Sequence, residues 1–128
     1  MTDWDPAATA LLSLLATTAR GPRREGIFAL WLTVRVAQDL LREPPPSERA
    51  HRKRLQALEN RLSSLTIPLP LRRALVAAIS QLREVRSETA VLVLSQLVAP
   101  ARDTGGVEVG EAVAQAARSA RAAARVGR

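Results

Sequence analysis

The 128-residue chain has no cysteine and no tyrosine, a single histidine, a single lysine and only three aromatic residues. Without cysteine, disulfides, thiolate zinc sites and thiol nucleophiles are excluded. The scarcity of aromatic residues disfavours β-structure and leaves few platforms on which single-stranded nucleic acid could stack. Proton transfer and nucleophilic attack would fall almost entirely to carboxylates and hydroxyls, and the acidic residues are scattered rather than grouped as metal ligands. We therefore expect a non-catalytic protein with no cofactor and no metal ion.

Three helix-forming residue types dominate what is present. Alanine, leucine and arginine contribute 23, 19 and 18 residues, and all three have high helix propensity. The length fits one domain with a single hydrophobic core. The sequence thus predicts an all-α fold, a compact bundle of about six helices in one domain over residues 1–128.

Prolines and capping residues mark where the predicted helices begin. Asp5 followed by Pro6, then Ser47, and later Ser87 are typical N-terminal signals. Short polar side chains cap free N–H groups, and proline is accepted at the first helical position. The helices expected from these signals cover approximately 6–20, 24–42, 48–65, 70–82, 88–99 and 107 (or 110)–125.

A proline and a glycine pair predict a stop after the fifth helix. Pro100 is followed by Asp103-Thr104-Gly105-Gly106, a composition typical of a loop. Asp103-Thr104-Gly105 matches the triplet around the catalytic aspartate of aspartic proteases. That class of enzyme needs two such carboxylates in a β-rich frame. The chain has one triplet and few candidate strands, so we interpret the segment as a Gly-rich helix connector.

Apolar residues recur at helical spacing. The segment 24–42 is apolar nearly all the way round and includes Phe28 and Trp31, which predicts a central, largely buried helix. For the run Val91–Leu94 we favour a buried helix, with a buried strand as the alternative, because so short a run has no decisive period. Two narrower stripes predict one core-facing side each: Leu55, Leu58, Leu62 and Leu65 in the third helix, and Leu71, Leu75, Ile79 and Leu82 in the fourth.

The order of helix types repeats along the chain. A shift of 64 residues places Pro6 on Pro70 and Leu11 on Leu75. Two interpretations stay open. One is an internal duplication of 5–65 and 69–126, packed as two three-helix halves related by a pseudo-twofold axis. The other is a pair of similar helical hairpins of separate origin.

Basic residues outnumber acidic ones by 19 to 12, a net charge of +7. Guanidinium groups fit phosphate oxygens, so two basic clusters are candidate contacts for an anionic partner. They are Arg49, Arg52, Lys53 and Arg54 in the third helix, and Arg118, Arg121 and Arg125 in the last. The simpler interpretation is a solvated surface that aids solubility. His51 lies inside the first cluster and is expected to be exposed to solvent.

These patterns favour a non-catalytic interaction protein: an adaptor, small subunit or scaffold. Its expected partner is another protein or a second copy of the chain, for which the alanine-rich stripe of the last helix is one candidate docking face. The alternative is a small helical subunit that binds the nucleic-acid backbone through its arginine-rich face. No run reaches the length of about 18 apolar residues that a membrane span needs. The leucine-rich segment 7–19 also lacks the preceding basic residues of a signal peptide, so we expect a cytoplasmic protein.

Overall fold

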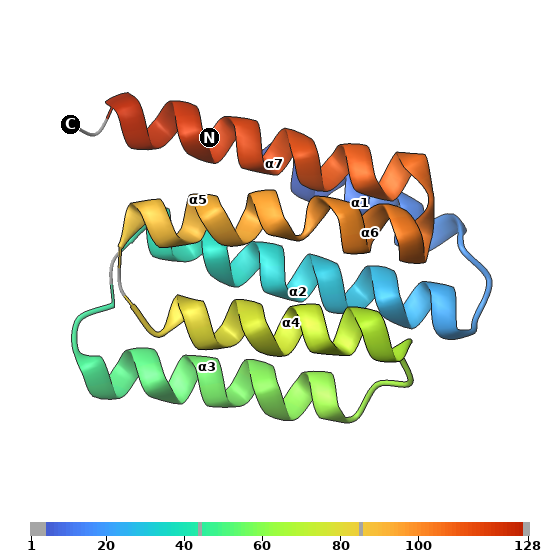
Figure 1. The fold of residues 1–128 in the computed structure, drawn as a ribbon, viewed down its shortest axis with the longest axis horizontal. Coiled ribbons are helices and arrows are strands. Elements are labelled where there is room, and N and C mark those ends of the chain that lie inside the picture. Colours follow the sequence, from blue (N-terminus) through green and yellow to red (C-terminus); the bar gives the residue numbers. More distant parts are fainter. Residues whose placement is uncertain (1–4, 44, 85, 127–128) are drawn as a thin grey trace.

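The computed structural model of the chain describes residues 5–43, 45–84 and 86–126, and every regular element within these ranges is an α-helix (Figure 1). This confirms the predicted all-α fold and the packed helical bundle. In chain order the helices are α1 (Asp5–Thr17), α2 (Pro22–Arg42), α3 (Glu48–Ser63), α4 (Leu69–Leu82), α5 (Ser87–Gln96), α6 (Val98–Gly105) and α7 (Val107–Val126).

Helices α5 and α6 are nearly collinear and are separated only at Leu97 (Figure 1). The seven helices of the described ranges therefore correspond to six helical segments of the bundle, with α5 and α6 as one segment. Pro100 interrupts the helix because it has no N–H to donate to the carbonyl of Gln96. The backbone stays helical on both sides of the break. The N–H of Leu97 donates to the carbonyl of Val93 over 3.1 Å, and the N–H of Ala101 donates to the carbonyl of Leu97 over 2.9 Å.

The expectation of a loop over residues 103–106 is wrong. Helix α6 runs through Gly105, and Pro100 lies in its first turn, where a missing N–H costs little. The helix ends at Gly106, whose φ of +92° lies in the region that favours glycine. Gly106 alone therefore joins α6 to α7.

One of the predicted N-terminal caps is confirmed. At the start of α3, the Ser47 side chain accepts the N–H of Ala50 over 3.1 Å. Helix α5 begins at Ser87 and follows Arg86, whose side chain makes no cap hydrogen bond, and the predicted cap at Ser87 falls on a side chain outside the described part of the structure. The predicted cap at residues 5–6 falls on side chains outside the described part of the structure.

Helix α2 lies at the centre of the bundle and contacts each of the other six helices of the described ranges. Its inner side is fully buried at Ile27, Leu30 and Val34, in agreement with the predicted central helix. The expected burial of its aromatic residues holds only in part, because Phe28 and Trp31 are half-buried.

The remaining apolar patterns mostly face the core as predicted. Val91–Leu94 is helical and belongs to α5, although Leu92 is 50% exposed and the run is therefore not buried on all sides. The three leucines of the predicted stripe that lie in α3 are buried, whereas Leu65 lies beyond the end of α3 and is half-buried. The stripe of α4 is buried throughout.

Helix α7 packs closely against α1, α2, α5 and α6. Its alanine stripe is covered by these helices, and Ala116 is fully buried.

Glycines permit the close approach of neighbouring helices. A Cβ atom on Gly110 would lie 2.9 Å from Cβ of Arg102 in α6, and one on Gly26 would lie 2.5 Å from Cγ2 of Thr104.

Helices α1 and α3 both contact α2 but not each other. In the view of Figure 1, α1 and α2 form the more distant layer, behind α4 to α7. The side of α2 that faces away from the core is therefore left without a covering helix between α1 and α3. This outer face of α2 carries the site described next.

Candidate interaction site on the outer face of helix α2

Four residues form a stripe along the outer face of α2. Arg24, Phe28, Trp31 and Arg35 follow one another at spacings of 4, 3 and 4 residues, which places them on one side of a helix. All four are half-buried. The sequence of α2 thus combines a largely apolar side that enters the core with a second side of aromatic rings and guanidinium groups.

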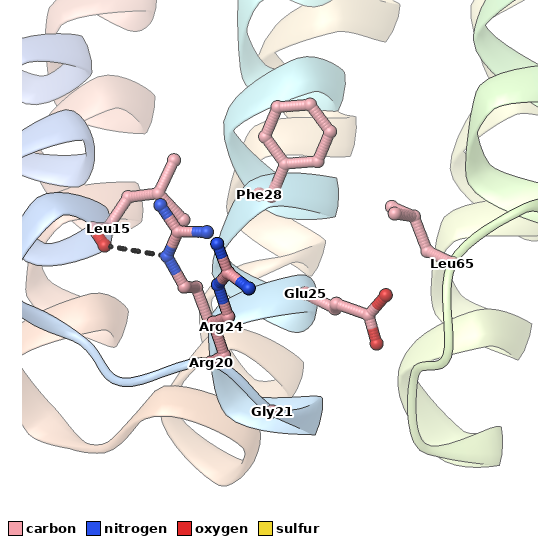
Figure 2. Close-up of a pocket in the computed structure, with 7 residues that line it drawn as sticks. All are labelled: Leu15, Arg20, Gly21, Arg24, Glu25, Phe28 and Leu65. Atoms are coloured by element: carbon pink, nitrogen blue, oxygen red, sulfur yellow. Dashed lines mark hydrogen bonds between the residues drawn. The ribbon is translucent and has the colours of Figure 1, made fainter.

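A pocket of about 450 Å³ opens at the beginning of this stripe (Figure 2). Helix α1 contributes Leu15, the turn before α2 contributes Arg20, and the segment after α3 contributes Leu65. The complete lining is Leu15, Arg20, Gly21, Arg24, Glu25, Phe28 and Leu65. Figure 2 shows the guanidinium groups of Arg20 and Arg24 on the side of Leu15, with the Glu25 carboxylate toward Leu65. The pocket therefore has apolar walls and a predominantly cationic rim.

Hydrogen bonds fix both sides of the pocket. Nε of Arg24 donates to the carbonyl of Leu15 over 3.2 Å, which ties α2 to the end of α1. The N–H of Thr66 donates to Oε2 of Glu25 over 3.2 Å, which ties α2 to the segment that follows α3. The one carboxylate of the lining is thus already used as a hydrogen-bond acceptor.

Two of the three aromatic residues of the chain meet at this site. The rings of Phe28 and Trp31 stack with centroids 6.1 Å apart and an interplanar angle of 19°. The Cζ atom of Arg61 in α3 lies 5.5 Å from the Phe28 centroid, within the range of a cation–π interaction. Among the described residues, the buried Nε1 of Trp31 has no hydrogen-bond partner. The stripe is thus an aromatic surface bordered by arginines.

The predicted basic residues of α3 lie elsewhere on the surface. The side chains of Arg49, Arg52, Lys53 and Arg54 are all exposed, and none of them lines the pocket. Nη2 of Arg54 lies 3.2 Å from Oδ2 of Asp39 in α2, so one of the four charges is already paired within the chain.

The second predicted basic cluster lies along α7, away from the pocket. Arg118 and Arg121 are exposed. Nη2 of Arg118 lies 2.8 Å from Oε1 of Glu111, and Nη2 of Arg121 lies 3.5 Å from Oγ of Ser95. The side chain of Arg125 lies outside the described part of the structure. The structure therefore does not bring the two predicted clusters and the pocket together.

The prediction that His51 is solvated is wrong. His51 is only 1% exposed, and its Nε2 lies 2.7 Å from the carbonyl oxygen of Leu82, the last residue of α4. A signal for this burial is present in the sequence, since His51 precedes Leu55 by four residues and so extends the leucine stripe of α3 by one turn. The four cations that neighbour His51 in the sequence indicate an exposed segment, and this signal is misleading for the histidine itself.

No group of three or more histidine, cysteine or acidic residues that could hold a metal ion occurs in the described ranges. Within the same ranges, none of the helices combines the length and apolar content needed to cross a bilayer. No protein-family model, curated protein sequence or solved structure matches the chain. The interpretation of the candidate site therefore rests on its geometry alone.

Proposed function

We propose that the chain is a non-catalytic interaction protein, an adaptor, small subunit or scaffold, that binds a partner protein on the outer face of α2. The observation that carries this proposal is the pocket of about 450 Å³ between α1, α2 and the segment after α3.

The residue types at the pocket support a binding role. Aromatic and arginine side chains are enriched among the residues that dominate binding energy at protein interfaces. This chain has only three aromatic residues, and it holds Phe28 and Trp31 at a half-buried surface. Covering such half-exposed aromatic surface with a partner contributes favourably to the free energy of binding.

A peptide-binding assay tests the proposal. We would label synthetic amphipathic helical peptides of about 15 residues, near the length at which isolated helices become stable, in acidic, neutral and basic versions. Fluorescence anisotropy would then measure their affinity for the chain. We expect at least one version to bind, and we expect Phe28→Ala to weaken that binding by about tenfold or more, as for an interface hot spot.

Leu92→Ala is the matched control, because Leu92 is a half-exposed apolar residue on α5, outside the pocket. It should leave the affinity unchanged. Binding that is insensitive to Phe28→Ala, or the failure of all three peptides to bind, would overturn the proposal.

A second candidate function is binding to the nucleic-acid backbone. It is favoured by Arg49, Arg52 and Lys53, which project from α3 with no carboxylate of the described residues within ion-pair distance. Binding of duplex DNA, single-stranded DNA and RNA at low and near-physiological salt distinguishes the two functions. Our first proposal predicts binding at low salt only, because nonspecific phosphate contacts weaken steeply as salt rises. Submicromolar binding at physiological salt, abolished by Arg49→Glu/Arg52→Glu/Lys53→Glu, would support this second function instead.

A further inference from the structure

We infer that the segment bound on the outer face of α2 is an acidic amphipathic helix of the partner, with carboxylates spaced about three turns apart on either side of an apolar patch. This inference rests on the proposed function and names the chemistry of the partner. Charge, spacing and the absence of a strand edge support it.

The charge around the stripe is unbalanced. Arg20 and Arg24 line the pocket, Arg61 lies over the Phe28 ring, and Arg35 lies one turn beyond Trp31 on the same face of α2. The terminal nitrogens of Arg24 make no hydrogen bond to the described residues, since only its Nε is used. These cations favour a partner with acidic side chains.

The two nearby acidic residues do not neutralise this surface. Glu25 accepts the backbone N–H of Thr66, and Asp39 is paired with Arg54 from α3. Glu25 keeps its negative charge, since the backbone N–H is neutral, but Arg20, Arg24, Arg35 and Arg61 outnumber it on this face. A basic partner would therefore meet a net positive surface.

The order of residues along α2 sets the spacing. Arg24 precedes Phe28 by one helical turn, and Arg35 follows Trp31 by one turn. The two arginines are eleven residues apart, which corresponds to about 16 Å along the helix axis. A helix lying along α2 would place its acidic residues over these two ends and its apolar residues over the aromatic pair.

The architecture favours a helix over an extended segment. Extended peptides commonly bind by adding a strand to the edge of a sheet, whereas amphipathic helices bind in grooves between helices. Every regular element of the described ranges is a helix, so these ranges offer no strand edge. Helices α1 and α3 flank α2 without touching each other, and the pocket between them is where an apolar side chain of such a helix would insert.

The test compares three helical peptides of about 15 residues. The first has glutamates at both ends of an apolar patch, the second has lysines in their place, and the third has the composition of the first with the glutamates moved into the patch. Binding is measured by calorimetry and by the fluorescence of Trp31 in a Trp4→Phe background, where Trp31 is the only tryptophan. We expect the first peptide to bind at least about tenfold more tightly than the other two, since two favourable charge contacts become absent or repulsive.

Substitutions of the arginines complete the test. We expect Arg20→Gln/Arg35→Gln to weaken binding of the first peptide by about tenfold while a peptide with glutamine for glutamate is unaffected. Neither of these two side chains makes a hydrogen bond to the described residues, so the variant should fold normally, which its circular dichroism would verify. Arg49→Gln/Lys53→Gln removes the same amount of charge from α3 and should leave the affinity unchanged.

The outcomes separate this inference from the proposed function. Equal binding of acidic, neutral and basic peptides that is still lost on Phe28→Ala would refute the acidic partner and retain the binding surface. Equal affinity for the first and third peptides would refute the spacing. Binding that is insensitive to Phe28→Ala would refute both the inference and the proposed function.

Discussion

Replacement of the buried histidine of α3 should strongly destabilise the fold. His51→Ala removes a fully buried ring and the hydrogen bond of 2.7 Å between Nε2 and the carbonyl of Leu82. Large-to-small changes in a core cost about 2–5 kcal/mol, and a buried group left without its partner costs about 1–3 kcal/mol. His51 also lines a pocket of about 260 Å³, through which water can reach the exposed carbonyl. We therefore take the lower part of these ranges and expect a loss of about 3 kcal/mol.

Thermal and urea unfolding measure this effect. For a domain of this size, 1 kcal/mol corresponds to about 4 °C in Tm, so His51→Ala should lower Tm by about 12 °C with an unchanged urea m-value. His51→Gln keeps an N–H donor at a similar reach and should recover most of the loss. Arg52→Ala, at an exposed neighbour, should change stability by less than about 0.5 kcal/mol. If His51→Ala were no more destabilising than Arg52→Ala, the cross-helix bond to Leu82 would not stabilise the fold as we infer.

Three further changes test a packing contact, a helix cap and a surface ion pair. Gly26→Ala should lower the free energy of unfolding by about 1 kcal/mol, because overpacking against Thr104 outweighs the gain in helix propensity. In a Thr104→Ser background, which lacks the contacting methyl group, the same change should raise the free energy of unfolding. Equal effects in both backgrounds would contradict the contact. Ser47→Ala should cost about 1 kcal/mol in urea unfolding through loss of the cap of α3, and an unchanged midpoint would argue against the cap. Arg118→Ala should cost less than about 0.5 kcal/mol, because its pair with Glu111 is exposed; a loss above about 1 kcal/mol would show that we undervalue this pair.

Local signals in the sequence predicted most of the helices. Ser47 before an amphipathic segment was sufficient to locate the start of α3, and the leucine spacings identified the buried sides of α3 and α4. These features depend on hydrogen bonds and contacts within one or two turns, so the amino-acid order alone specifies them. The internal duplication of 5–65 and 69–126 stays a prediction.

Sequence-based predictions fail where one local pattern is compatible with two different structures. Pro100 indicates a helix stop, yet the first turn of a helix also accepts proline, and α6 starts just before it. His51 was judged from its charged neighbours in sequence, whereas its environment is set by Leu82 of α4, 31 residues away. Composition around a residue gives little information about a partner so distant along the chain.

The candidate site was not predicted because it depends on the packing of whole helices. The sequence predicts that Phe28 and Trp31 are buried in the core, and they do lie on the central helix but are only half-buried. Their exposure follows from the separation of α1 and α3 on the two sides of α2, a property that no single segment encodes. The predicted basic residues whose side chains the structure describes, by contrast, are exposed as surface charges but lie outside the pocket.

The most direct test of the binding surface is an NMR footprint. Amide spectra of the ¹⁵N-labelled chain would be recorded with and without the acidic peptide that has glutamates at both ends. We predict shift changes concentrated in α2 from Arg24 to Arg35, at Leu15 and around Arg61–Leu65, with little change in the exposed residues of α5 and α7. Changes centred on Arg49–Arg54 or on the C-terminal half of α7, with α2 unaffected, would contradict the account.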